Sequence, residues 1–166
     1  MNASAGFLLR VAQTKPGATH VINAGWFPAL RDSRLFDIDP DLGFGEGCFR
    51  YYFVHMLMIH YYVGRGDPNA IGKYYELVLG IIRVVTCCIL SKGPQNEQMI
   101  KLGRKFLDET KNVAMTVFKK HANIGGAKRE SVSGELKELT ELFVLLMSLT
   151  GYIEVRLPLK GRRVQS

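Results

Sequence analysis

Apolar residues recur at helical spacing along most of this 166-residue chain. The clearest series runs from Asp67 to Ser91, where apolar positions follow the 3.6-residue period of an α-helix. Asp67 is a suitable N-cap, Pro68 stands in the first turn, and Lys92-Gly93 matches helix-stop chemistry. The predicted inner positions are Ile71, Tyr74, Tyr75, Val78, Ile81, Ile82, Val85, Cys88 and Ile89, widened by Val84, Cys87 and Leu90. A stripe this wide predicts contact with more than one neighbouring helix.

A Gly-Pro corner at Gly93-Pro94 separates this helix from the next apolar series. A helix is predicted from Gln95 to about Asp108, and the apolar face resumes up to Ala122. Residues 109–112 are compatible with either a break or a continuous helix. The expected inner residues of this region are Met99, Ile100, Gly103, Phe106, Leu107, Val113, Val117 and Phe118.

The two ends of the chain also read as helical. Residues 1–30 predict short helices separated at 14–17 and near Gly25, with Phe7, Leu8 and Val11 lining one face of the first. A polar linker, residues 127–134, precedes a last helix that Ser131 or Ser133 could cap. The residues expected to face inward in the last helix are Leu136, Leu139, Leu142, Phe143, Leu146, Met147 and Leu149.

Residues 32–66 interrupt this pattern and are predicted to form an irregular connector or insertion. The first part is rich in Asp, Pro and Gly, and the second part, residues 48–63, is aromatic and apolar. That second part is shorter than the roughly 20 residues that a membrane-spanning helix needs, so a buried helix or strand is the better interpretation. The sequence therefore predicts a single all-α domain over 1–166, without a transmembrane segment, whose final residues 161–166 are disordered.

Composition adds limits on function. Hydrophobic residues make up 47% and charged residues 22%, which is typical of a folded globular protein. The formal net charge is +7, but the basic residues are spread out and no basic stripe interleaves with aromatics. Direct nucleic-acid binding is therefore not expected, although a basic nucleic-acid or membrane-surface binding protein remains the alternative. Three cysteines, two of them adjacent, do not make a disulfide framework and suit a reducing compartment.

No set of residues predicts catalysis. The chain has no HExxH, CxxC or GxSxG motif, and His55 and His60 are five residues apart, which suits no helical metal site. His121 is expected in solvent, and Glu135, Glu138 and Glu141 are expected to form a solvated face. We therefore expect no enzyme activity, no metal, no cofactor and no small-molecule substrate.

Four stretches carry a family resemblance: residues 6–43, 74–89, 90–126 and 141–154. In this order they resemble the C-terminal tail of the very large inner-ring scaffold nucleoporins of the nuclear pore complex, the one-ninety-two and two-hundred-five branch. The resemblance implies an α-helical solenoid fragment of the HEAT or armadillo kind, located at the nuclear envelope. It also implies a non-enzymatic structural role that supports nucleocytoplasmic transport. Residues 46–66 depart from the family pattern, either as a genuine insertion or as translated intron sequence.

In that family, the tail binds short helical segments of flexible linker nucleoporins. The resemblance thus implies other nucleoporins as partners, held in an apolar groove between helices. The last helix and the tail after it are the expected place, and basic residues would help to attract acidic linkers. The candidate contact residues are Phe143, Met147, Tyr152 and Ile153. Plain core packing is the alternative for Phe143 and Met147.

Overall fold

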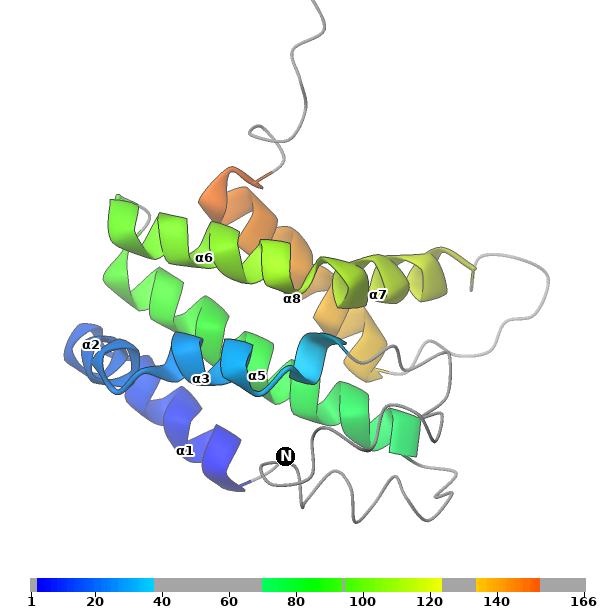
Figure 1. Cartoon of the computed structure of the whole chain (residues 1–166), viewed down its shortest axis with the longest axis horizontal. Helices are drawn as coiled ribbons and strands as arrows, with labels where there is room; N and C mark the ends of the chain where they lie inside the picture. Colours follow the sequence, from blue (N-terminus) through cyan, green and yellow to red (C-terminus); the bar gives the residue numbers. More distant parts are fainter. Residues whose placement is uncertain (1–2, 38–69, 94, 124–133, 153–166) are drawn as a thin grey trace, which may run out of the picture.

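The computed structural model describes residues 3–37, 70–93, 95–123 and 134–152 (Figure 1). All regular structure within these ranges is helical, which confirms the predicted all-α class. The elements are α1 (Ala3–Ala12), α2 (Lys15–Asn23), α3 (Trp26–Asp32), the 3-10 helix η1 (Leu35–Asp37), α5 (Ala70–Lys92), α6 (Glu97–Glu109), α7 (Lys111–Asn123) and α8 (Gly134–Thr150). The predicted features at 46–66, 127–133 and 161–166 lie outside the described residues.

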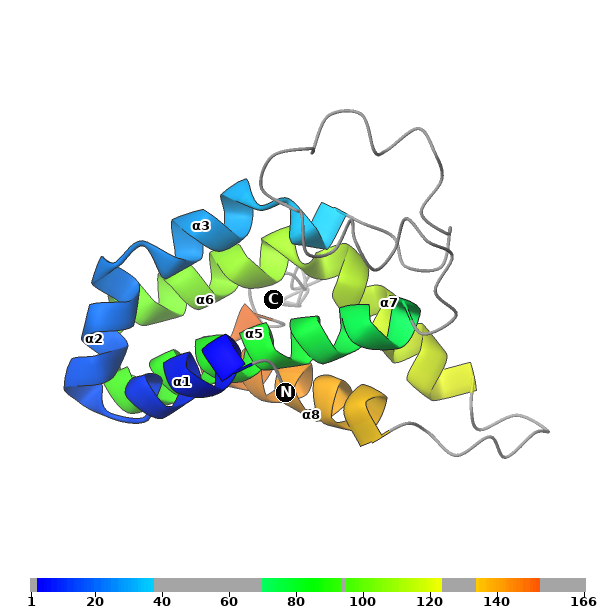
Figure 2. The ribbon, with the colours of Figure 1, turned by 90° about the horizontal axis from the view of Figure 1, so that it is seen from below.

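Helix α5 is the centre of the fold. It packs against α1 and α2 on one side, α8 on the other, and α6 across it. Figure 2 shows α1, α5 and α8 on one side of the molecule, α3 and α6 on the other, and α2 joining the two layers. The wide stripe predicted for α5 accounts for this position, since Val78, Ile82 and Val85 are completely buried and α5 as a whole contacts α1, α2, α6 and α8.

Because it is so apolar, α5 is also the one described helix, over Gly72–Lys92, long and apolar enough to cross a membrane. Within this fold, 67% of that stretch is buried against other helices. In this fold, the apolar residues of α5 therefore fill the core between the two helix layers.

Helices α6 and α7 are separated at a single residue, which resolves the two alternatives left open by the sequence. Thr110 is completely buried, and its hydroxyl donates to the Phe106 carbonyl at 2.9 Å. The two helices follow each other closely in Figure 1. Helix α6 begins two residues later than predicted because Asn96 is its N-cap, accepting a hydrogen bond of 3.0 Å from the Met99 N–H.

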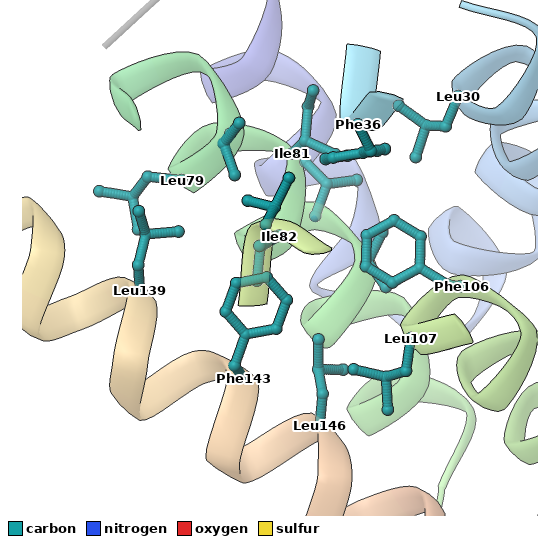
Figure 3. Packing of buried hydrophobic residues seen from close by; sticks show 14 of the residues in the cluster. Leu30, Phe36, Leu79, Ile81, Ile82, Phe106, Leu107, Leu139, Phe143 and Leu146 are labelled. Atoms are coloured by element: carbon teal, nitrogen blue, oxygen red, sulfur yellow. The ribbon is translucent and has the colours of Figure 1, made fainter. Parts of the chain in front are cut away.

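An aromatic cluster holds α6 against α3 and η1. Phe106 makes an edge-to-face contact with Phe36 at a centroid distance of 5.5 Å (Figure 3). It makes a second edge-to-face contact with Phe27 at 6.4 Å. Leu35 and Phe36 stand in the first part of the predicted connector, yet both are buried in η1. The Tyr74 hydroxyl donates to the Leu35 carbonyl at 3.4 Å. The irregular connector was thus predicted to begin too early, because two apolar residues among Asp and Arg gave little periodic signal.

Two residues predicted to face inward are exposed. Phe7 is 67% exposed, because α1 turns a different side to α5: Ala12 is completely buried, and its carbonyl accepts a 2.7 Å hydrogen bond from Ser91. Leu90 is 49% exposed, so the stripe of α5 narrows at its last turn. Both predictions were wrong because the spacing of apolar residues along one helix does not show which parts of that helix its neighbours cover.

Candidate partner-binding surface

Helix α8 carries the residues that the sequence suggested for partner binding. Phe143 is completely buried and makes an edge contact with Phe118 at a centroid distance of 6.1 Å. Figure 3 shows Phe143 pointing inward towards Ile82, between Leu139 and Leu146 of the same helix. Phe143 therefore packs in the core beneath α8 and is not exposed on the surface of this helix.

Met147 and Tyr152 lie at the C-terminal end of α8 and are both half-buried against the hydrophobic core. Part of each side chain is exposed, and the structure places both candidates at the same end of the helix. Ile153, the fourth candidate, lies outside the described residues.

Helix α6 holds this end of α8 in place. The Arg104 Nε donates to the Thr150 carbonyl at 2.7 Å, and the Tyr152 hydroxyl donates to Asp108 Oδ1 at 2.8 Å. The helices approach closely at Gly103, where a Cβ would lie 2.7 Å from Thr150 Cγ2. Sequence reasoning placed Gly103 on the inner side of α6 but gave no signal that Arg104 and Asp108 reach the last helix.

A second surface lies between α5 and α8 and was not predicted. Arg83 Nε donates to Glu138 Oε1 at 2.6 Å and Arg83 Nη2 to Glu138 Oε2 at 2.5 Å. The hydrogen bonds to Arg83 hold the pKa of the Glu138 carboxyl below its usual range, and the same bonds raise the pKa of Arg83. The predicted solvated glutamate face was thus wrong at Glu138, because its partner is 55 residues away in sequence.

Helical register extends this second surface towards the C-terminal ends of α5 and α8. Leu90 and Leu145 each follow a member of the ion pair by seven residues, or about two turns, and α5 and α8 run in the same general direction (Figures 1 and 2). Leu90 is 49% and Leu145 38% exposed. One turn after the ion pair, Cys87 and Leu142 are half-buried. The surface between these helices therefore changes from charged to apolar along its length.

His121 and Cys88 occupy structural positions. His121 was expected in solvent, but it is half-buried and its Nδ1 lies 3.0 Å from Thr140 Oγ1, joining α7 to α8. Cys88 lies in the core as predicted, and burial raises its pKa to about 11. In the ranges that the structure covers, no three His, Cys, Asp or Glu side chains come together as a metal site.

Comparison with known proteins adds a family match. A family model described as nuclear pore complex scaffold, nucleoporins 186/192/205, matches residues 1–150 of this chain. The chain is also 27% identical, over 180 aligned positions, to nucleoporin NUP192 of Chaetomium thermophilum. That alignment covers 92% of this chain and 9% of the relative, so the chain spans about a tenth of the relative's length.

Proposed function

Since this chain belongs to the family of nuclear pore complex scaffold nucleoporins 186, 192 and 205, we propose that it is a scaffold module that holds short helices of other nucleoporins. Membership confirms three predictions: the family is a scaffold, it is not enzymatic, and it belongs to the nuclear pore complex. The match over residues 1–150 is the observation that carries the proposal, because it extends from α1 to the end of α8.

The position within a longer protein is part of the proposal. The four stretches that resemble the family's C-terminal tail span α1 to α8 in order, so we place the chain in that tail, within the inner ring. The two helix layers described above are compatible with one segment of an α-solenoid, in which each helix pair packs only on its neighbours. In this arrangement, the chain contributes to nucleocytoplasmic transport by holding other pore components in position.

The end of α8 is the proposed contact with a linker nucleoporin. Met147 and Tyr152 are half-buried, so a partner would bury the remaining apolar surface at a gain of about 25 cal/mol per Å². Ile153 would extend the contact, and Phe143 would keep the underlying helix rigid. The net charge of +7 would speed the approach of an acidic linker segment without fixing where it binds.

A capture experiment tests this function. The purified chain is incubated with nuclear extract at two salt concentrations, and the bound proteins are identified by mass spectrometry. We expect nucleoporins at both salt concentrations, because salt screens interactions between charges and does not weaken apolar contacts. Met147→Ser and Tyr152→Ala should abolish that recovery, whereas Phe7→Ala, an aromatic truncation at an exposed position of α1, should preserve it.

Two other outcomes count against the proposal. Recovery of only nucleic acid or acidic proteins, lost as salt rises, would favour the basic-protein alternative. Nucleoporin recovery that is unchanged by Met147→Ser and Tyr152→Ala would keep the scaffold role but remove the end of α8 as the contact.

A further inference from the structure

The Arg104 side chain of α6 contacts a backbone carbonyl at the C-terminal end of α8. The last four carbonyls of an α-helix have no partner within the helix. Arg104 satisfies one of them, since its Nε lies 2.7 Å from the carbonyl oxygen of Thr150. Its positive charge also suits the negative end of the helix dipole. One side chain of α6 thereby resists fraying of the last turn of α8.

Asp108 lies one turn further along α6, on the same side as Arg104. Its Oδ1 accepts a 2.8 Å hydrogen bond from the Tyr152 hydroxyl. A tyrosine side chain has only two main rotatable bonds, so fixing the hydroxyl at one end and the backbone at the other restricts the whole ring. Asp108 thereby orients one of the two proposed partner contacts.

Because Gly103 has no side chain, α6 and α8 approach closely enough for the hydrogen bonds of Arg104 and Asp108 to form. A Cβ at this position would lie 2.7 Å from Thr150 Cγ2 and 2.9 Å from Ile89 Cδ1, so any larger residue would push α6 away from α8. The three α6 residues Gly103, Arg104 and Asp108, which we call the α6 clamp, therefore act on one turn of α8.

We infer that Arg104 and Asp108 are positioning residues for the partner surface at Met147 and Tyr152. This role rests on the proposed function. The α6 clamp orders the last turn of α8 and the Tyr152 ring before a partner arrives, so less conformational entropy is lost on binding. Partner affinity is then controlled from α6, through Thr150 and Tyr152.

Hydrogen–deuterium exchange of the whole chain tests the clamp without any partner. We expect Arg104→Gln to speed exchange in the peptide covering residues 147–152 about tenfold, with little change in α5. Lys101→Gln is the matched control, because Lys101 is exposed on α6 and pairs only weakly with Glu97, at 4.0 Å. Exchange at the wild-type rate in Arg104→Gln would overturn the inference.

The pair formed by Asp108 and Tyr152 gives a second readout that general destabilisation would not reproduce. Asp108→Asn keeps an acceptor oxygen and should bind nucleoporins nearly as the wild type does, whereas Asp108→Ala should bind several-fold more weakly. In a Tyr152→Phe background, Asp108→Ala should weaken nucleoporin binding much less than it does alone, because the hydrogen bond is already absent. Additive losses would overturn the positioning role of Asp108.

The two readouts separate the inference from the proposed function. Faster exchange in Arg104→Gln with unchanged nucleoporin capture would overturn the positioning role and leave the scaffold function intact. If the wild-type chain captures no nucleoporin at all, the proposed function fails, and the positioning role fails with it even when exchange responds as expected.

Discussion

The Arg83 guanidinium of α5 donates two parallel hydrogen bonds to the Glu138 carboxylate of α8, with N···O distances of 2.6 and 2.5 Å. The side chains are 28% and 39% exposed, so the pair is only partly screened by water. Paired hydrogen bonds of this kind fix direction as well as distance. The pair therefore sets how α8 lies against the central helix, across 55 residues of sequence.

Removing one member of this pair should destabilise the fold modestly. We expect Glu138→Gln to lower the free energy of unfolding by about 1 kcal/mol, because partial exposure weakens a charge-assisted pair. Urea unfolding measures the change, and a double-mutant cycle with Arg83→Met isolates the pair energy. Glu141→Gln is the control, since Glu141 is exposed and lies 4.0 Å from Lys137. Equal effects at positions 138 and 141 would contradict the prediction.

The same pair should make stability depend on pH in the acid range. Arg83 lowers the Glu138 pKa below its ordinary value of 4.5, so the stabilisation is fully present well above pH 4.5. It should be lost as pH falls through the lower pKa of the folded state. The stability difference between the wild type and Glu138→Gln should therefore be largest near neutral pH and shrink below pH 4.5. A difference that grows towards acid pH would reverse the assigned sign.

Gly103→Ala should destabilise the chain although alanine is the better helix former. The alanine gain of about 1 kcal/mol is outweighed by overpacking against Thr150 and Ile89, which costs about 1–3 kcal/mol. Thermal unfolding gives the net effect. Combining Gly103→Ala with Thr150→Ser, which removes the methyl group at 2.7 Å, should recover part of the loss. A stabilised single variant would show that α6 and α8 separate freely.

Neighbouring positions on α8 should respond in opposite ways to truncation. Phe143→Ala should cost about 3–5 kcal/mol, because the ring is completely buried and leaves a cavity. Val144, the next residue, is 52% exposed. Val144→Ala should therefore change the free energy of unfolding by no more than about 0.5 kcal/mol. Phe143→Leu provides a milder core variant where the alanine variant does not fold. Similar losses at both positions would contradict the placement of Phe143 in the core.

The adjacent cysteines should differ in reactivity. Cys88 is completely buried with a pKa of about 11, so at pH 8 it carries about 100-fold less thiolate than an ordinary cysteine. Cys87 is half-buried and serves as the internal comparison. Alkylation with iodoacetamide, followed by peptide mass spectrometry, should label Cys88 only as fast as the chain unfolds. Labelling of Cys88 in the folded chain would overturn its core position.

Local sequence patterns predicted the parts of the fold that depend on one helix at a time. The 3.6-residue period placed Val78, Ile82 and Val85 of α5 in the core, and the all-α class followed from it. The 49% exposure of Leu90 could not be predicted in the same way, because it depends on which elements cover the last turn of α5. Periodicity describes a helix surface, whereas burial also depends on the elements that cover it.

The candidate surface shows the same division. Met147 and Tyr152 were suggested by apolar character and family resemblance, and the structure leaves both partly exposed. Arg104 and Asp108 look like ordinary surface charges in sequence, because their partners are 46 and 44 residues away. Nothing in the sequence indicated that Arg83 pairs with Glu138 either. Long-range polar pairs carry no periodic signature, so a single sequence does not reveal them.

The central place of α5 has a consequence for synthesis on the ribosome. Helices α1 and α2 pack on each other and on α5, so the sides that they turn to α5 remain uncovered when residue 37 has been made. Completing α5 requires another 55 residues, up to Lys92, which takes about 3–11 s at ordinary translation rates of 5–20 residues per second. During that interval the nascent helices α1 and α2 are candidates for chaperone binding. Mutations that weaken α5 should therefore lower the yield of folded chain by more than their equilibrium effect alone.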